Sequence, residues 1–253
     1  MAAQHRDLSA GPLGQVVVHL KTTTSTNDHA AMLARQGAPD GTLVIADEQT
    51  AGRGRRGRVW LAPPRSSLLC SLILRPHLTP NQAPRLTMLA AVAAVCAIRA
   101  LGLPATIKWP NDVMVNERKV GGILTETAIE GDHLEYAIVG IGLNVNIKAT
   151  DLASISPQAT SLMVESGRRL SRQRILRLLL AEFGLRYQGM GRDGGLAVFE
   201  EWQTLMSTIG RQVTVFLGEE SVSGLVEGVD ADGALLLRQC DGQRVRVTIG
   251  EVS

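Results

Sequence analysis

Residues 119–146 read KVGGILTETAIEGDHLEYAIVGIGLNVN and contain two long strand-forming runs. Both runs are rich in Ile, Val, Leu and Thr, and the Gly131–Asp132 turn between them is typical of a β-hairpin. Directly upstream, DVMVN (112–116) ends at a second turn, Glu117–Arg118, which predicts another hairpin with the start of the same segment. The two hairpins predict a sheet of consecutive antiparallel strands.

On both sides of this segment the chain contains further predicted strands and helices. The helix boundaries rest on possible N-cap residues, on Pro84 at a helix start, and on Gly37 and Gly102 at helix ends. Residues 147–160 are polar and are expected to be irregular. The other expected strands lie at 15–20, 42–47, 66–75 and 105–112. The expected helices lie at 29–36, 84–101, 171–190 and 195–207.

From Gly210 onward the sequence changes to short alternating segments separated by turns such as GEE and DADG. This pattern is typical of a small all-β unit closed on itself. We therefore expect a domain boundary near residues 208–210, which divides the chain into 15–207 and 208–253. Residues 1–14 are rich in small residues and are expected to form a flexible leader.

Composition excludes some classes of protein. Hydrophobic residues make up 45% of the chain and aromatic residues only 3%, so the core must be aliphatic. A formal net charge of +2 argues against a nucleic-acid-binding field over the whole surface. We expect a cytoplasmic protein without membrane contact, because no apolar stretch has the length of a signal peptide or a membrane span. Three cysteines without metal spacing, Cys70, Cys96 and Cys240, suggest reduced and buried thiols.

The segment GRGRRGR, residues 52–58, contains four arginines: Arg53, Arg55, Arg56 and Arg58. Glycines let the backbone approach a ligand closely, and each guanidinium can offer two donors to carboxylate or phosphate oxygens. The segment therefore predicts a phosphate-rich ligand, with an RNA-binding arginine–glycine segment or a solvated loop as alternatives. A Walker loop is excluded because no Gly-Lys-Ser/Thr follows. We refer to residues 50–60 as the arginine loop.

Two polar motifs upstream of the hairpins could contact a ligand. The first, Ser25–Asn27, offers hydroxyl and carboxamide groups at a helix start, where they could cap the helix or bind a small neutral ligand such as a ureido ring. The second, KWPND (108–112), places Trp109, Asn111 and Asp112 around a proline turn. That turn could simply pack the indole, or its two polar side chains could face a nucleotide or its metal.

Two further motifs lie on the predicted hairpin strands. Lys119 opens a strand and would ordinarily be solvated, but Gly121 and Gly122 allow a ligand or another backbone to lie against that strand. Asn144 and Asn146 end the long strand, where they could cap a turn or require partners in a buried site. The five histidines show no metal spacing and no Gly-x-Ser-x-Gly motif is present, so we expect neither an intrinsic metal site nor covalent catalysis.

Taken together and in this order, these motifs resemble the biotin–protein ligase family. The motifs are STN, QTAGRGRRGRVW, KWPND, RKVGGILTE and GIGLNVN, and the segment from residue 210 resembles the family's small Src-homology-type barrel. The resemblance implies an α+β fold, in which a mixed β-sheet flanked by helices precedes that barrel. The sheet would be of the class II aminoacyl-tRNA synthetase and biotin ligase type. Residues 15–207 would then be the catalytic domain, which binds biotin and ATP.

The resemblance also implies roles for individual residues. Biotin would be bound by Ser25, Thr26, Asn27, Gln49, Gly52, Arg53, Gly54 and Lys119. ATP, accompanied by Mg²⁺, would be bound by Arg55, Arg56, Arg58, Trp60, Asn111 and Asn144, with Trp60 in the adenine pocket. Because the biotin carboxylate must attack a phosphate, cationic groups are needed between two anions. The predicted catalytic residues are Lys119, Arg53 and Arg55.

The implied acceptor is a biotin carboxyl carrier protein or domain, belonging to an acyl-CoA or pyruvate carboxylase. The first strand of the catalytic domain starts near residue 15, so we expect no N-terminal DNA-binding module and no DNA partner. A monomer or a weak homodimer is expected. A lipoate–protein ligase and a biotin-responsive repressor are alternatives from the same fold, and the arginine loop favours the biotin branch.

Overall fold

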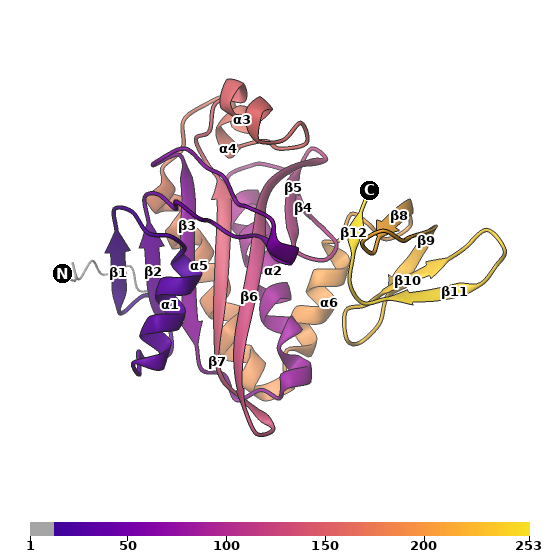
Figure 1. The fold of residues 1–253 in the computed structure, drawn as a ribbon, viewed down its shortest axis with the longest axis horizontal. Coiled ribbons are helices and arrows are strands. Elements are labelled where there is room, and N and C mark those ends of the chain that lie inside the picture. The colour runs from indigo at the N-terminus through magenta and orange to yellow at the C-terminus, as the bar shows by residue number, and fades with distance from the viewer. Residues whose placement is uncertain (1–12) are drawn as a thin grey trace.

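The computed structural model describes residues 13–253, which form a seven-stranded sheet with helices on both faces and a second, smaller sheet (Figure 1). The large sheet has the strand order β1-β2-β3-β7-β6-β5-β4. β1 and β2 are parallel and the other neighbouring pairs are antiparallel, so the sheet is mixed, which confirms the predicted fold class. Its strands are β1 (Val17–Leu20), β2 (Thr42–Ala46), β3 (Ser67–Leu74), β4 (Ala105–Lys108), β5 (Asp112–Val115), β6 (Arg118–Glu130) and β7 (His133–Asn144).

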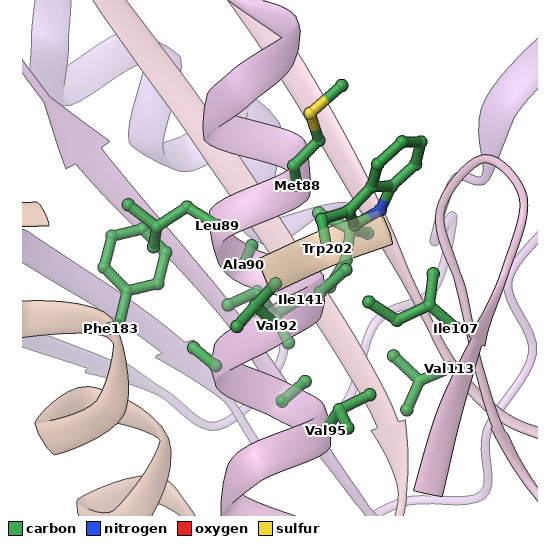
Figure 2. Packing of buried hydrophobic residues seen from close by; sticks show 14 of the residues in the cluster. Met88, Leu89, Ala90, Val92, Val95, Ile107, Val113, Ile141, Phe183 and Trp202 are labelled. Carbon is green, nitrogen blue, oxygen red and sulfur yellow. The ribbon is translucent and has the colours of Figure 1, made fainter. Parts of the chain in front are cut away.

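One face of the large sheet packs against α2 (Pro84–Arg99) and α5 (Arg172–Asp193), and α6 (Leu196–Thr204) lies beside α2. Alternate residues of a strand point to opposite faces, and Leu68, Cys70, Leu72 and Leu74 of β3 all belong to the core under these helices. Figure 2 shows Met88, Leu89 and Val92 of α2 packed among strand residues, with Phe183 and Trp202 beside them. The core is thus mainly aliphatic, as the composition predicts.

The burial of α2 also accounts for its apolar sequence. By length and composition, Pro80–Arg99 could cross a membrane, but 61% of this segment is buried inside the protein. A helix that packs between a sheet and two other helices is expected to be apolar on nearly all sides. The apolar character of α2 therefore follows from its place in the core.

The opposite face of the sheet is covered by α1 (Thr26–Arg35) over only part of its area. Ala30 and Ala34 of α1 belong to a second core with Val44, Ile73 and Ile138 of the sheet. Beyond the start of α1, the arginine loop crosses in front of β7 and β6 towards the smaller sheet (Figure 1). This part of the face is where a ligand has access to the sheet.

The C-terminal residues form a five-stranded antiparallel sheet with the order β11-β10-β9-β8-β12. The all-β unit predicted from Gly210 is therefore confirmed. β11 and β12 stand at the two ends of this order, so the ladders between the described strands do not close the sheet into a full barrel. The strands are β8 (Gln212–Phe216), β9 (Ser221–Val229), β10 (Leu235–Arg238), β11 (Arg244–Val247) and β12 (Glu251–Val252).

Two helices differ from the sequence-based expectation. Residues 147–160, predicted to be irregular, contain α3 (Ala149–Ile155), and the short helix α4 (Leu162–Ser166) follows. Only Leu152 of α3 is buried, and a helix of seven residues is too short for its apolar spacing to predict a helix reliably. Its formation depends on neighbouring structure that local sequence does not reveal.

The leader and one cysteine also differ from the prediction. Leu13 is fully buried in the main core and Gly14 donates a hydrogen bond to Gly41 O, so the flexible leader is wrong for these two residues. Residues 1–12 lie outside the described part of the chain. All three cysteines are free, but only Cys70 is buried; Cys96 is partly buried and Cys240 is exposed, which corrects their predicted burial.

Candidate functional site

A groove of about 500 Å³ lies on the open face of the large sheet. It is bounded by the start of α1, the arginine loop, residues 155–159 at the end of α3 and just beyond it, and the C-terminal strand β12. All residues that the resemblance assigns to biotin or ATP line this groove, except Gly52. Those that line it are Ser25, Thr26, Asn27, Gln49, Arg53, Gly54, Arg55, Arg56, Arg58, Trp60, Asn111, Lys119 and Asn144.

Three glycines make the floor of the groove flat. Gly142 on β7 is opposite Gly122 on β6, and Gly140 lies two residues away on the same face of β7. A Cβ atom at Gly142 would lie 2.8 Å from Cε2 of Trp60, and one at Gly140 would clash with the Asn27 side chain. The Trp60 indole therefore rests directly on the sheet backbone, where no larger residue than glycine fits beneath it.

One end of the groove is lined by buried neutral polar groups. The backbone N–H and the hydroxyl of Thr26 donate to Gln49 Oε1 at 2.8 and 2.9 Å. Ser71 Oγ lies 2.8 Å from Thr26 Oγ1 and 2.7 Å from Asn27 Oδ1. Ser25 is the N-cap residue of α1, but its side chain makes no capping hydrogen bond, so the capping interpretation of this motif is wrong. These side chains form a network that can bind a small neutral polar ring.

Arg53 lies at this neutral end and is paired with two carboxylates. Its Nη2 is 2.5 Å from Asp28 Oδ1 and 3.0 Å from Glu126 Oε1. Glu126 also accepts a hydrogen bond of 2.7 Å from Asn27 Nδ2. Asp28 and Glu126 were not among the site residues predicted from the sequence. Strand alternation provided a signal for Glu126, because it lies four residues after Gly122 and hence on the same face of β6.

The other end of the groove is charged. Lys119 Nζ lies 2.5 Å from Asp112 Oδ1, so this lysine is not simply solvated. Arg55 Nη1 donates to Asn111 Oδ1 at 3.1 Å, and Asn111 Nδ2 donates to Ile123 O at 2.6 Å. The structure thus brings together Lys119, Arg55 and Asn111 from separate parts of the chain. Asp112, which the sequence analysis left as an alternative, lies among them.

Burial perturbs two cations at the charged end. Burial lowers the pKa of the Arg55 guanidinium. The negative charge of Asp112 opposes this shift, and the positive charge of Arg56 adds to it. Burial also lowers the pKa of the Lys108 ammonium. The negative charge of Asp112 opposes this shift, and the positive charge of Lys119 adds to it. An anion that enters the groove would stabilise both desolvated cations, so this end is suited to a phosphate or a carboxylate. Lys108 belongs to the KWPND motif, but the sequence analysis did not select it as a site residue.

The arginine loop is anchored to the smaller sheet as well. Arg56 Nη1 donates to Phe216 O at 3.3 Å, and Arg58 forms an ion pair with Glu251 of β12. Arg56 has a φ of +57° within a short 3₁₀ turn, Arg55–Gly57, which directs consecutive arginines to different partners. The C-terminal sheet therefore contributes directly to the wall of the groove.

Gly52 is the exception among the predicted residues. It does not line the groove, and its carbonyl accepts a hydrogen bond of 2.8 Å from Trp60 N. A Cβ atom at this position would lie 2.5 Å from Trp60 O and 2.8 Å from Gln49 Nε2. Gly52 thus allows the two ends of the arginine loop to pack closely, which is a structural role; its contact with biotin stays a prediction.

Two buried polar atoms of the groove have no hydrogen-bond partner within residues 13–253: Trp60 Nε1 and Asn144 Oδ1. Asn144 Nδ2 donates to Thr160 O at 3.0 Å, so only its oxygen is unsatisfied. Buried acceptors normally have partners, and a ligand or an ion can supply one. Mg²⁺ in phosphate sites is typically held by one or two protein oxygens together with phosphate oxygens, and Asn144 and Asp112 offer such oxygens.

The sequence matches two family models that together cover the sheet and the C-terminal unit. Residues 19–144 match the Biotin/lipoate A/B protein ligase family, and residues 208–253 match the Biotin protein ligase C terminal domain. The chain is 38% identical over 232 residues to the Bifunctional ligase/repressor BirA of Bacillus subtilis, covering 91% of this chain and 71% of that protein. It is 35% identical over 232 residues to the Biotin--[acetyl-CoA-carboxylase] ligase of Paracoccus denitrificans, covering 89% and 95%.

The fold is similar to solved structures of the same kind. The structure of biotin protein ligase from Aquifex aeolicus in complex with biotin and ATP gives a TM-score of 0.76 at 29% identity. The similarity covers 94% of this chain and 97% of that one. It therefore extends over both sheets and over the groove on the large sheet.

Proposed function

Because the chain belongs to the biotin/lipoate A/B protein ligase family, we propose that the groove is the site at which it joins biotin to ATP and then to protein. The chain is a biotin protein ligase, which forms biotinyl-5′-AMP and pyrophosphate and transfers biotin to a lysine of a biotin carboxyl carrier protein. One observation supports this use of the groove above all. A buried neutral polar end and a cationic end lie on one glycine floor, and biotin has a neutral ureido ring and a carboxylate at its two ends.

The neutral end would bind the ureido ring. Thr26, Asn27 and Gln49 present donors and acceptors that already form a buried network with Ser71, and a preorganised network costs little to order on binding. The Trp60 indole, resting on Gly142, would pack against the apolar part of the ligand. The indole lies near both the predicted biotin residues and the predicted ATP residues, so a contact with adenine also remains a prediction.

The cationic end would perform the first step. A biotin carboxylate oxygen forms a bond to the α-phosphorus of ATP, and the bond to the bridging oxygen breaks as pyrophosphate leaves with the electron pair. Two anions must approach each other, so positive charge between them lowers the barrier. Lys119 and Arg55, which lie at this end of the groove, would fill this role. Mg²⁺ bound to the triphosphate would neutralise part of its charge, and Asn144 and Asp112 would help to hold it.

The second step needs a neutral amine. The acceptor lysine attacks the carbonyl carbon of the adenylate, AMP leaves, and the amine must lose a proton, which its usual pKa of about 10.4 makes unfavourable at neutral pH. Asp112 and Glu251 are the carboxylates among the described residues that line the groove, and Glu251 is paired with Arg58. We propose that Asp112, next to Lys119, accepts this proton.

Arg53 was predicted to be a catalytic residue, but its side chain lies at the neutral end of the groove. Its guanidinium pairs with Asp28 and Glu126 at the neutral end, and the charged end contains Lys119 and Arg55 instead. We therefore propose that Arg53 holds the arginine loop closed over the ureido site. This position fits the predicted role of Arg53 in biotin binding. It does not fit the predicted catalytic role of Arg53 between the biotin carboxylate and the α-phosphate.

A direct experiment tests the function. Purified protein incubated with biotin, ATP, Mg²⁺ and a biotin carboxyl carrier domain should give a carrier that is heavier by one biotinyl group on one lysine, measured by mass spectrometry. Isothermal titration should show binding of biotin and not of lipoate, which is the substrate of the nearest alternative enzyme. A carrier that stays unmodified while the protein binds lipoate would contradict the proposal.

Location and assembly remain proposals. We propose a cytoplasmic enzyme, which the free state of Cys70, Cys96 and Cys240 supports. We still expect a monomer or weak homodimer. We also expect no DNA partner, which agrees with the net charge of +2. The proposed division into a catalytic domain, 15–207, and a C-terminal domain, 208–253, agrees with the start of β8 at Gln212.

We predict that ligands order the arginine loop and the segment 147–158 over the adenylate. With biotin and ATP bound, tryptic cleavage within the arginine loop should slow by about tenfold or more, because only the open loop is cleaved and the ligand stabilises the closed state. Cleavage at the exposed Arg192, at the end of α5, serves as the control and should not change. Equal cleavage of the loop with and without ligands would contradict the prediction.

We predict that Arg55→Gly releases the adenylate early. Arg55 joins the arginine loop to Asn111 at the charged end, and its loss removes both a phosphate contact and this anchor. Biotinyl-5′-AMP should escape and label lysines of an added bystander protein, with a rise of about tenfold over wild type, as expected for one charge-assisted hydrogen bond. Western blotting with labelled streptavidin measures this. Unchanged bystander labelling, with the adenylate still formed, would argue against the role.

A further inference from the structure

Lys108, the last residue of β4, is a cation of the groove without a direct partner. It is partly buried and lines the groove. The ammonium groups and guanidinium groups around it are engaged, since Lys119 pairs with Asp112 and Arg58 with Glu251. Within residues 13–253, the Lys108 ammonium makes no hydrogen bond and no ion pair. A desolvated ammonium in this position is suited to an anionic ligand.

The sheet register shows which part of the ligand Lys108 would meet. One row across the groove face runs from Gly142 on β7 through Gly122 on β6 and Asp112 on β5 to Lys108 on β4. Trp60 covers the glycines at the start of this row, on the side of the ureido site. Lys108 therefore lies at the far end, two strand spacings or about 10 Å from the backbone of β6, which carries Lys119.

We propose that Lys108 binds the pyrophosphate part of ATP and stabilises it as it leaves. This inference rests on the proposed function. In the first step, the electron pair of the breaking bond moves onto pyrophosphate, and no proton is needed if a cation takes up the growing charge. Lys119 lies nearer the carboxylate and α-phosphate, and Lys108 lies one strand beyond Asp112, where the outer phosphates of the same triphosphate would reach.

Other ligands fit Lys108 less well. The acceptor lysine is a cation in solution and would be repelled by a second ammonium. The biotin carboxylate is expected beside Lys119, next to Gly122, because the proposed ureido site is near Asn27 at the other end of the floor. Burial lowers the pKa of Lys108, and a bound polyphosphate would reverse this cost by supplying negative charge. Of the charged groups in the reaction, the outer phosphates of ATP therefore fit the position and the charge of Lys108 best.

The test compares Lys108→Met with Lys108→Arg. Methionine keeps the aliphatic packing and removes the charge, and arginine keeps the charge. We expect Lys108→Met to lower kcat/KM for ATP in adenylate formation by about tenfold or more, as for the loss of one charge-assisted hydrogen bond. Inhibition by added pyrophosphate should weaken by a similar factor. Lys108→Arg should restore most of both effects.

The second half-reaction separates this role from general damage. Biotinyl-5′-AMP contains no pyrophosphate, so transfer from preformed adenylate to the carrier should be unchanged in Lys108→Met, as should the affinity for biotin. The exposed Lys21, changed to Met, is the matched control and should leave all rates unchanged. If Lys108→Met does not fold, Lys108→Gln replaces it in the same assays.

Three results would overturn the inference while the wild-type enzyme remains active. They are an unchanged kcat/KM for ATP, unchanged inhibition by pyrophosphate, and an equal loss in both half-reactions, which would indicate a structural role. A wild-type protein that releases no pyrophosphate in the presence of biotin and ATP would instead contradict the proposed function. The two failures can thus be told apart.

Discussion

Changing Lys119 to alanine should reduce adenylate formation by about a hundredfold to a thousandfold, the range for removal of one preorganised charge-stabilising donor. Lys119 is the cation that pairs with Asp112 beside Gly122, where the biotin carboxylate and the α-phosphate are expected to meet. Without it, two anions approach each other with one fewer positive charge. Biotin-dependent release of pyrophosphate under single-turnover conditions measures the effect.

The fold should survive this change. The backbone of Lys119 donates to Gln158 O and accepts from Thr160 N, each at 2.8 Å, and alanine preserves both contacts. A thermal melt should therefore be shifted by only a few degrees, and Lys21→Ala, at an exposed lysine, should leave the rate unchanged. Release of pyrophosphate at the wild-type rate from Lys119→Ala would remove Lys119 from the mechanism.

The strands that form the floor of the groove could be predicted because their signals are local. Turns at Asn116–Glu117, one residue before the predicted position, and at Gly131–Asp132 separate β5, β6 and β7, and the structure contains these strands in that order. Alternation along β6 places Gly122 and Glu126 on one face, which is information already present in the sequence. The motifs located the site because STN opens a helix, KWPND and GIGLNVN end strands, and RKVGGILTE opens a strand, all beside this same groove.

The partners of the arginines could not be predicted in this way. Arg53 pairs with Asp28 and Glu126, which are 25 and 73 residues away, and Arg56 contacts Phe216 O, 160 residues away. Such pairs depend on how separate elements pack, and no spacing in the sequence encodes them. For the same reason Leu13 was assigned to a leader, although it fills the main core.

The contacts between the arginine loop and the C-terminal sheet give that sheet a function in the site. Glu251 and Phe216 hold the loop from the side opposite to Asp28, so the loop is attached at both ends of the groove. A loop tied to two separate sheets can close over a ligand only when both are in place. The β-unit recognised in the sequence as a separate domain thus completes the wall of the groove.

Changing Asp112 to asparagine should separate the two half-reactions. Adenylate formation should fall much less, because asparagine still offers an oxygen to Lys119 and to Mg²⁺, and the cations remain. Transfer of biotin from preformed biotinyl-5′-AMP to the carrier lysine should fall by about a hundredfold or more, the usual contribution of a general base. Raising the pH should recover part of the lost rate, because more of the acceptor amine is then deprotonated in solution.

A small nucleophile provides the decisive comparison. Hydroxylamine is largely uncharged at neutral pH and needs no base before it attacks, so Asp112→Asn should react with it at close to the wild-type rate from the bound adenylate. Asp132→Asn, at a carboxylate that is fully exposed, controls for the loss of one charge. If Asp112→Asn slows the hydroxylamine reaction as much as the lysine reaction, Asp112 positions the adenylate and does not accept the proton. If it slows adenylate formation as strongly, its main task is to orient Lys119 at 2.5 Å, and the base for the second step must be supplied by the carrier or by water.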